Sequence, residues 1–404
     1  MKKILSTLLL TLLLALLITT PSYAKGTVCK IGSKGYSSLQ AAVDAVKDGQ
    51  TITVTKAIKA TERVQCKVSS KTFTIDFRKK KYTYNGDDCA IGFDLGNSVV
   101  VKNMNMTGTN MFQVGGGSLT ISSGKATCKH LADLTQHPAA ISKLTIKGGT
   151  LECAGWDGPG PFIMNHGGNI VISKGTFKNA DIGNNQGTLS IKGGNFKFNR
   201  TSLTCLIENG ENCTAKISGG QFESQGSGSM IWNKGKITIS GGTYLSTGSN
   251  SNCLGSSDEV KDAKMVVTGG TFETRGQFAV YAPNGLTIKG GTFTGDINGG
   301  GTISGGTFKG EVGSFGNAKL ILKGGTTTIG VGAHHESSLI IENFTVKQGN
   351  NPKGSCLSTF NNGKITVKGG KFTSKNGMGY SGNITFTMKN YKKLFNVKML
   401  TTNK

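Results

Sequence analysis

Side chains that could bind a ligand gather in the segments "CKHLADLTQHPAA" and "CAGWDGPGPF", which begin at residues 128 and 153. An indole can stack on a sugar ring, and a nearby carboxylate can accept hydrogen bonds from sugar hydroxyls. Loop insertions on one face of a repeat protein commonly form its binding surface. The alternative is that these are ordinary loop residues. The candidate ligand-binding residues are Asp133, His137, Trp156, Asp157 and His166.

The triplet His334-His335-Glu336 has the residue types of a metal site. Adjacent residues in a strand point to opposite sides, so both histidines could not easily hold one ion. The spacing of the cysteines does not match a zinc pattern either. We therefore expect no metal and no cofactor.

A repeated element must position these residues. The stretch "LTIKGGTF" at 286 returns as "LTIKGGTL" at 144, "LSIKGGNF" at 189, "ITISGGTY" at 237 and "ITVKGGKF" at 365. The second Gly of the turn marks each copy. From Gly124 to Gly370 there are eleven repeats, so the mean repeat length is (370 − 124)/11, or about 22 residues. Alternating apolar residues predict a half-buried strand, Gly-Gly a sharp turn, and the following aromatic a return to the core.

A second signal precedes most of the strands: a short apolar piece, then Asn, then Gly, as in "IMNHG", "LIENG", "IWNKG", "YAPNG" and "TFNNG". Asn tolerates a left-handed backbone and can hydrogen-bond to its neighbour on the next turn. Such coils bury their apolar sides only by stacking. A propeller would need about twice this repeat length, and the spacing of a leucine-rich repeat is absent. The sequence predicts an all-β, right-handed parallel β-helix over residues 51–382.

The ends of the column should be covered, because an open sheet edge invites aggregation. In "YSSLQAAVDAV" (36–46), Leu39, Val43 and Val46 share one helical face, and Ser37 or Ser38 can cap the helix. Residues 25–50 are therefore the expected N-terminal cap, with a capping helix. The amphipathic segment within 383–404 is the expected C-terminal cap.

Residues 1–24 have the pattern of an export signal, with Lys2-Lys3, an apolar run and "SYA" before a cleavage site. The apolar run is too short to span a membrane, and no second run follows. We expect a secreted or cell-surface protein without a membrane span.

The chain carries 46 Lys+Arg and 22 Asp+Glu, a net charge of +24. Such a charge favours a polysaccharide or another anionic polymer as partner, and export disfavours nucleic acid. The outward position just before the Gly-Gly turn, called the slot below, is often Lys, with Ser or Thr between the lysines. This predicts a cationic stripe suited to a linear polyanion; the alternative is charge that serves solubility. The stripe lysines are Lys147, Lys192, Lys289, Lys323 and Lys368.

The nine cysteines cannot all pair within one molecule. Cys128 and Cys153 lie four residues after Gly124 and Gly149, so they should be neighbours on adjacent turns. They could form a disulfide or remain two buried thiols. We favour thiols, because the interior of a β-helix holds small stacked side chains.

The chain resembles the pectin-lyase-like superfamily of right-handed parallel β-helices. The resemblance rests on "SLQAAVDAVKDGQTITV" (38–54), the coil length and the Asn turns, and it covers most of residues 25–404. It implies the fold. The superfamily includes pectate lyases, polygalacturonases, phage tailspikes and surface proteins without enzymatic activity, so it does not decide the function.

The residues that those enzymes need are not in their expected places. The polygalacturonase segments "NTD", "DD" and "GHG" do not occur in their usual order, and "GDDC" at 86–89 lies in the early coils. Acids are scattered, and none of the four arginines is in a lyase motif. We therefore predict a protein that binds polysaccharide, in particular acidic polysaccharide, without cleaving it, and we assign no catalytic residue. The alternative is a lyase or glycoside hydrolase acting on an acidic polysaccharide such as pectin.

Overall fold

The computed structural model describes residues 26–67, 70–94, 96–155, 160–201, 205–349 and 354–401. Strands make up 61% of the structure and helices 3%, so the fold class is all-β. The predicted export signal (1–24) lies outside the described residues.

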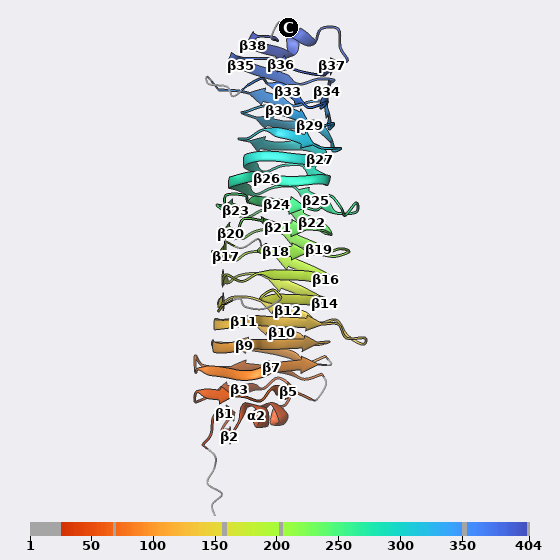
Figure 1. The fold of residues 1–404 in the computed structure, drawn as a ribbon. Helices are drawn as coiled ribbons and strands as arrows, with labels where there is room; N and C mark the ends of the chain where they lie inside the picture. The colour runs from red at the N-terminus through yellow and green to blue at the C-terminus, as the bar shows by residue number, and fades with distance from the viewer. Residues whose placement is uncertain are drawn as a thin grey trace, which may run out of the picture.

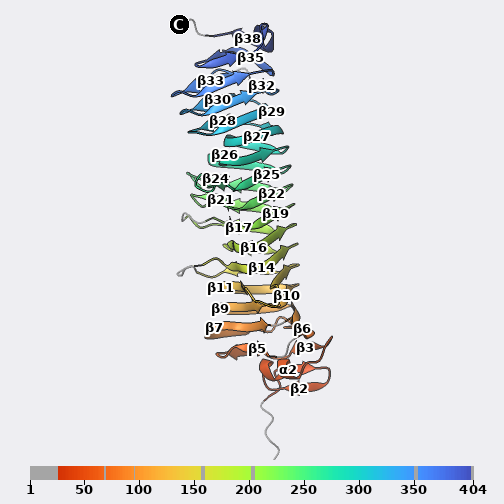
Figure 2. The ribbon, with the colours of Figure 1, turned by 90° about the vertical axis from the view of Figure 1, so that its right-hand side faces the viewer.

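The chain winds into a long column of about 15 turns, with its N-terminal and C-terminal residues at opposite ends (Figure 1). The view from the side shows the same narrow stack (Figure 2). Beyond the first strands, each strand pairs in parallel with strands of the coils before and after it. The structure is a parallel β-solenoid, which confirms the predicted β-helix.

Each coil contributes to three faces of the column. Face 1 contains the strands that precede the Gly-Gly turns. Several long strands run around a corner and so contribute to more than one face. The strands of face 1 are β3 (Thr51–Val54), β6 (Thr72–Asp76), β8 (Ser98–Lys102), β10 (Ser118–Ile121), β12 (Lys143–Ile146), the ends of β14 (Ile163–Ile172) and β16 (Ile182–Ile191), β19 (Thr214–Ile217), β22 (Lys236–Ile239), β25 (Lys264–Val267), parts of β26 (Thr271–Ile288), β27 (Thr292–Phe308) and β29 (Lys319–Thr327), β31 (Ser338–Ile341), β34 (Lys364–Val367) and β37 (Ile384–Phe386).

Face 2 follows the Gly-Gly turns, and face 3 closes each coil. Face 2 contains β4 (Ile58–Ala60), the starts of β7 (Tyr82–Asp94), β9 (Met104–Gly115) and β11 (Gly124–Thr135), then β13 (Thr150–Cys153), β15 (Thr176–Lys178), β17 (Asn195–Phe198), β20 (Gln221–Ser224), β23 (Thr243–Ser246), parts of β26, β27 and β29, β32 (Thr345–Lys347), β35 (Lys371–Met378) and β38 (Phe395–Met399). Face 3 contains β5 (Val64–Cys66), the remaining parts of the long strands β7, β9, β11, β14, β16, β26 and β27, and β18 (Ile207–Asn209), β21 (Ser229–Asn233), β24 (Asn252–Ser256), β28 (Val312–Phe315), β30 (Val331–His334), β33 (Leu357–Phe360) and β36 (Tyr380–Ser381).

The Gly-Gly turn between faces 1 and 2 requires both of its glycines. Gly291 has a φ of +112°, a conformation that residues with a side chain rarely adopt. At Gly290 a Cβ would lie 2.7 Å from the carbonyl oxygen of Thr268 on the preceding coil. The predicted Gly-Gly turn is confirmed: the positive φ explains Gly291, and the close stacking of the coils explains Gly290.

The aromatic residue after the turn re-enters the core, as predicted. Consecutive rings stack with centroids 4.3 to 5.1 Å apart. Such offset pairs contribute about 0.5–1.5 kcal/mol beyond the burial of their area. The stack ends where Thr327 takes the ring position beside Phe308. Its members are Phe177, Phe196, Phe222, Tyr244, Phe272, Phe293 and Phe308.

A ladder of buried asparagines lines the turn between faces 3 and 1. Side-chain amides connect Asn165 to Asn184 (2.7 Å), Asn184 to Asn209 (2.8 Å) and Asn209 to Asn233 (2.8 Å). The predicted hydrogen bond to the next turn is therefore present. The left-handed backbone expected at Asn165, Asn209 and Asn233 is wrong, since none of the three has a positive φ. Among the predicted Asn segments, the left-handed backbone occurs in "TFNNG", where φ is +47° at Asn361 and +64° at Asn362.

The N-terminal end is covered by α2 (Leu39–Ala45) and the antiparallel strands β1 (Cys29–Ile31) and β2 (Lys34–Tyr36). Of the two candidate caps, Ser38 is the one used: its hydroxyl accepts a hydrogen bond from the Ala41 amide at 3.0 Å. Val43, on the inner side of the helix, is buried in the core. The helix thus hides the apolar end of the first coil.

At the C-terminal end, β37 and β38 pair in parallel with β34 and β35, and the 3-10 turn η1 (Tyr391–Leu394) lies between them. Tyr391 stacks on Phe386 with ring centroids 4.2 Å apart. This end therefore combines a last coil with an aromatic cluster. Within the described ranges, no helix has the length and apolar character needed to cross a membrane.

Cys128 and Cys153 are direct neighbours in the ladder between β11 and β13, as predicted, and both are free thiols. Burial raises the pKa of the Cys128 thiol. The guanidinium of Arg200 donates a hydrogen bond to Sγ of Cys153 at 2.9 Å. The pair is therefore part of the packed interior.

Candidate functional site

The predicted loop cluster is only partly within the described residues. Trp156 and Asp157 lie outside them. Asp133, in β11, is the neighbour of Met164 in β14. Burial raises the pKa of the Asp133 carboxyl, while the positive charges of His166 and His130 lower it. Asp133 and His166 are therefore close enough to interact electrostatically.

His137 has a different environment, in the turn that follows β11. Its Nδ1 accepts a hydrogen bond from the amide of Ala139 at 3.1 Å. Its ring packs beside Gly116, where an added Cβ would lie 3.0 Å from it. His137 therefore has a local role in its turn and is not placed by any contact with Asp133 or His166.

The two histidines of the triplet have separate partners. His334 Nε2 lies 2.7 Å from Oε1 of Glu311, and this hydrogen bond, together with the charge of Glu311, raises the pKa of the imidazole. The ring of His335 packs instead on Phe315, with centroids 4.3 Å apart. Among the described residues, no group of three or more His, Cys, Asp or Glu side chains could hold a metal ion.

The stripe lysines all occupy the slot. The backbone amide of a slot residue donates a hydrogen bond to a backbone carbonyl on the preceding coil. That carbonyl belongs to the residue just before the slot of that coil. Lys147 donates to Ile121 at 2.8 Å, and Lys368 donates to Ile341 at 2.7 Å. Lys192 and Lys289 follow the same rule, and Lys323 directly follows Leu322, which pairs with Ile303 and Ile341. All five side chains are exposed.

A second column of lysines stands on the same face and was not recognised in the sequence. Its residues lie four positions before the slot, and since side chains alternate with a period of two, both columns point outward. Four residues of strand span about 13 Å, which is the distance between the columns. The sequence shows this spacing in "KLTIK", where Lys143 lies four positions before Lys147 and would point to the same side of the strand. The second column contains Lys143, Lys236, Lys264, Lys319 and Lys364, all exposed.

Acids are nearly excluded from face 1. Among its described strand and slot positions, the acids are Asp76 and Glu342. Asp76 lies 3.6 Å from the ammonium of Lys102, and Glu342 lies 3.9 Å from Lys323 and 3.8 Å from Lys368. Both carboxylates are therefore paired with lysines, and the remaining lysines of the face have like-charged or neutral neighbours. We call the two columns together the lysine face.

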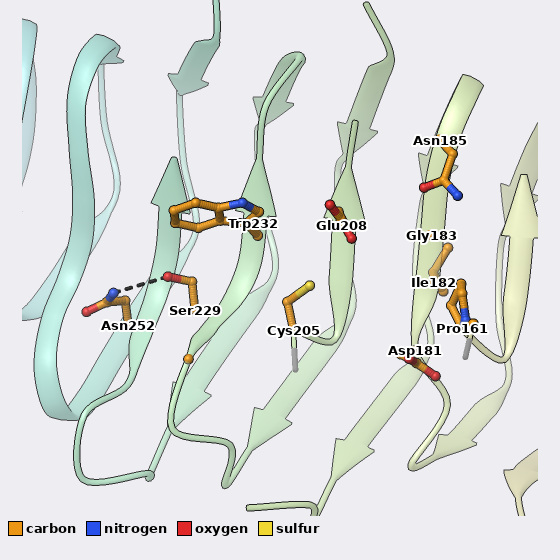
Figure 3. A pocket seen from close by; sticks show the side chains of 12 residues that line it. Pro161, Asp181, Ile182, Gly183, Asn185, Cys205, Glu208, Ser229, Trp232 and Asn252 are labelled. Atoms are coloured by element: carbon orange, nitrogen blue, oxygen red, sulfur yellow. Dashed lines mark hydrogen bonds between the residues drawn. The ribbon is translucent and has the colours of Figure 1, made fainter. Parts of the chain in front are cut away.

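A groove of about 640 Å³ lies on face 3, from the residues just before β14 across β16, β18, β21 and β24 (Figure 3). Trp232 projects outward from β21 between the inward-facing Ile231 and Asn233. Glu208 and Gly255 are its neighbours on the adjacent strands. Trp232 is part of "IWNKG", a segment that was interpreted from the sequence only as an Asn turn. Its outward position next to Asn233 could have indicated a binding residue. The groove is lined by Gly160, Pro161, Asp181, Ile182, Gly183, Asn185, Cys205, Glu208, Gly228, Ser229, Trp232 and Asn252.

Comparisons with known proteins add no assignment to this geometry. A scan against protein-family models, a search of curated proteins and a search of solved structures each returned no match. The lysine face and the groove are therefore interpreted from their own chemistry.

Proposed function

We propose that this protein binds a linear acidic polysaccharide along the lysine face without cleaving it. The observation that supports the proposal is the pair of parallel lysine columns on one face of a rigid column. The negative charges of face 1 are confined to Asp76 and Glu342 among its described strand and slot positions, and both are paired. Face 1 thus presents aligned lysines with few negative charges among them.

The spacing suits an extended polymer. Lys147 and Lys192 are separated by two coils, or roughly 10 Å at the usual distance between strands. A polyanion lying along the column would meet one ammonium after another, and many weak contacts would add through multivalency. A compact anion would engage only a few of them. The geometry therefore favours a long chain with regularly spaced carboxylates or sulfates.

The side chains on this face support binding without cleavage. General acid–base catalysis needs a group whose pKa is near the working pH and which reaches the reacting bond. The described outward positions of the face 1 strands hold Lys, Ser, Thr, Asn and aliphatic side chains besides the two paired acids. They supply attraction and hydrogen bonds, and they supply no such acid–base pair.

Two further parts of the proposal concern origin and location. The parallel solenoid, its capping helix and its Asn ladder support membership of the pectin-lyase-like superfamily. The pattern of residues 1–24 supports export to the cell surface or the medium. An acidic polysaccharide is a partner that an exported basic protein would encounter there.

The test replaces Lys147, Lys192 and Lys289 by Ser, the residue that already occupies neighbouring slots. If each exposed charge contributes about 0.5 kcal/mol, the affinity for polygalacturonate should fall roughly tenfold. Wild-type retention should also weaken steeply with salt, because charges are screened over about 8–10 Å at physiological ionic strength. Both effects are measured by retention on immobilised polygalacturonate at several salt concentrations.

The matched control removes the same charge from face 2, with Lys178, Lys309 and Lys347 changed to Ser. Its retention should stay near that of the wild type. Equal losses in the two triple variants would show that only net charge matters and would overturn the lysine face as a site. New reducing or unsaturated ends in the eluate would instead support the lyase or hydrolase alternative.

A further inference from the structure

The groove on face 3 differs in chemistry from the lysine face. One side is formed by Pro161, Asp181 and Cys205, which lie shortly before the face 3 strands β14, β16 and β18. Its floor is the row of outward positions Gly183, Glu208, Trp232 and Gly255, on consecutive coils. The labelled side chains in Figure 3 come from consecutive coils and face the same hollow.

Glycines keep the floor open and place the indole. A Cβ at Gly183 would lie 2.7 Å from the ring of Pro161. At Gly255 a Cβ would lie 2.9 Å from Cε3 of Trp232, so the indole lies across the neighbouring strand where that strand has no side chain. Trp232 is half-buried in this position. The groove therefore has an aromatic surface, and its floor is bare backbone at the two glycines.

The polar groups around the indole are held in place by the protein. Oε1 of Glu208 accepts a 2.9 Å bond from the ammonium of Lys234, which leaves Oε2 available to a ligand. The side chain of Asn252 donates to Oγ of Ser229 at 3.1 Å, as drawn in Figure 3. Asp181, 8% exposed, accepts a bond from the Phe162 amide at 3.0 Å. Prearranged acceptors around an apolar surface are typical of small-molecule sites.

The charge of the groove argues against an acidic ligand. Its lining contains the carboxylates of Asp181 and Glu208 and no lysine or arginine. Lys234 is already bonded to Glu208. A sugar carboxylate placed on the indole would meet these acids, whereas neutral hydroxyls could donate hydrogen bonds to them. The apolar face of a pyranose ring matches the indole surface.

We propose that this groove is a second binding site, which holds an uncharged sugar residue stacked on Trp232 with its hydroxyls bonded to Glu208 and Asn252. The site is independent of the lysine face. It would let one molecule hold a neutral and an acidic glycan on different sides of the same column.

The chain has two tryptophans, Trp156 and Trp232, and this allows a direct test. In a Trp156→Phe protein, the tryptophan fluorescence comes from Trp232 alone. Titration with cello-, xylo-, manno- and galacto-oligosaccharides should give a saturable change in emission for at least one of them, and added salt should leave it unchanged. If none of the four shifts the emission of Trp232, the proposal is overturned.

Retention on the matching neutral polysaccharide gives the second measurement. Trp232→Ala should weaken binding about tenfold or more, which corresponds to the loss of about 1.4 kcal/mol. Trp232→Phe, which keeps a smaller ring, should fall between that variant and the wild type, and Glu208→Gln should weaken binding while its fold is retained. All three should keep wild-type retention on polygalacturonate. Unchanged neutral binding in Trp232→Ala, or competition by oligogalacturonate for the same site, would refute the assignment.

Discussion

Replacing Asn209 by Ala should destabilise the middle of the column more than any surface change of similar size. Asn209 is fully buried, and it both donates to Asn233 and accepts from Asn184, each at 2.8 Å. Alanine removes both of these bonds and a 3.3 Å bond from Asn209 to the carbonyl of Lys236, while Asn184 and Asn233 keep their side-chain amides. The perturbation therefore removes the ladder bond to Oδ1 of Asn233 and leaves the Asn184 amide with longer contacts only.

The size of the effect follows from those two partners. A buried polar atom without a partner costs about 1–3 kcal/mol. Asn184 keeps longer contacts to the carbonyls of Gly187 and Thr214, both at 3.5 Å, so its loss should be at the lower end. We therefore expect a total of about 2–5 kcal/mol. Asn209→Asp should cost at least as much, because it turns a carboxylate oxygen toward Oδ1 of Asn233.

Hydrogen exchange of the flanking strands is the appropriate assay, since repeat proteins can open in segments. The amides of β16, β18 and β21 should lose protection, while those of β31 and β34 should not. The matched control is Asn169→Ala, whose side chain accepts one bond from Thr188 at the surface and should change stability by less than about 0.5 kcal/mol. Equal protection in the Asn209 and Asn169 variants would refute the ladder as a source of stability.

Two other predictions concern backbone and charge. Gly291→Val should lower the free energy of unfolding by more than the roughly 1 kcal/mol typical of a Gly position, because φ is +112° there; a denaturation midpoint equal to that of the wild type would contradict this. Glu311 raises the pKa of His334 above 6.5, so the pair stabilises the fold below pH 6.5, and this contribution is lost as the pH rises through the raised pKa. The difference in melting temperature between wild type and Glu311→Gln should therefore shrink with rising pH, and a constant difference would exclude the imidazolium as the cause.

The sequence by itself determined the elements of this fold. The alternation in "LTIK" requires a strand with one buried side, and the Gly-Gly that follows requires a turn that no other residue pair makes easily. The helical face of Leu39, Val43 and Val46 likewise predicts the capping helix. These are local properties, because strand period, glycine conformation and helix amphipathicity act over a few neighbouring residues.

Only the tertiary structure decided which residues become neighbours. Successive turn glycines are separated by as few as 306 − 291 = 15 residues and by as many as 270 − 242 = 28, so contacts between coils cannot be read from a fixed period. Asn184 joins the Asn ladder from "IGNNQG", a segment that does not show the expected Asn-Gly pair.

The binding surfaces depend on the same register. Glu208 and Trp232 are neighbours because β18 and β21 stack in step, although 24 residues, 232 − 208, separate them. Stacking is set by the buried aromatic and aliphatic side chains, which align the coils and carry the outward residues with them. The lysines of the slot could therefore be predicted from the sequence. The second lysine column and the Trp232 groove could be recognised only from the structure, because core packing sets which outward residues are neighbours.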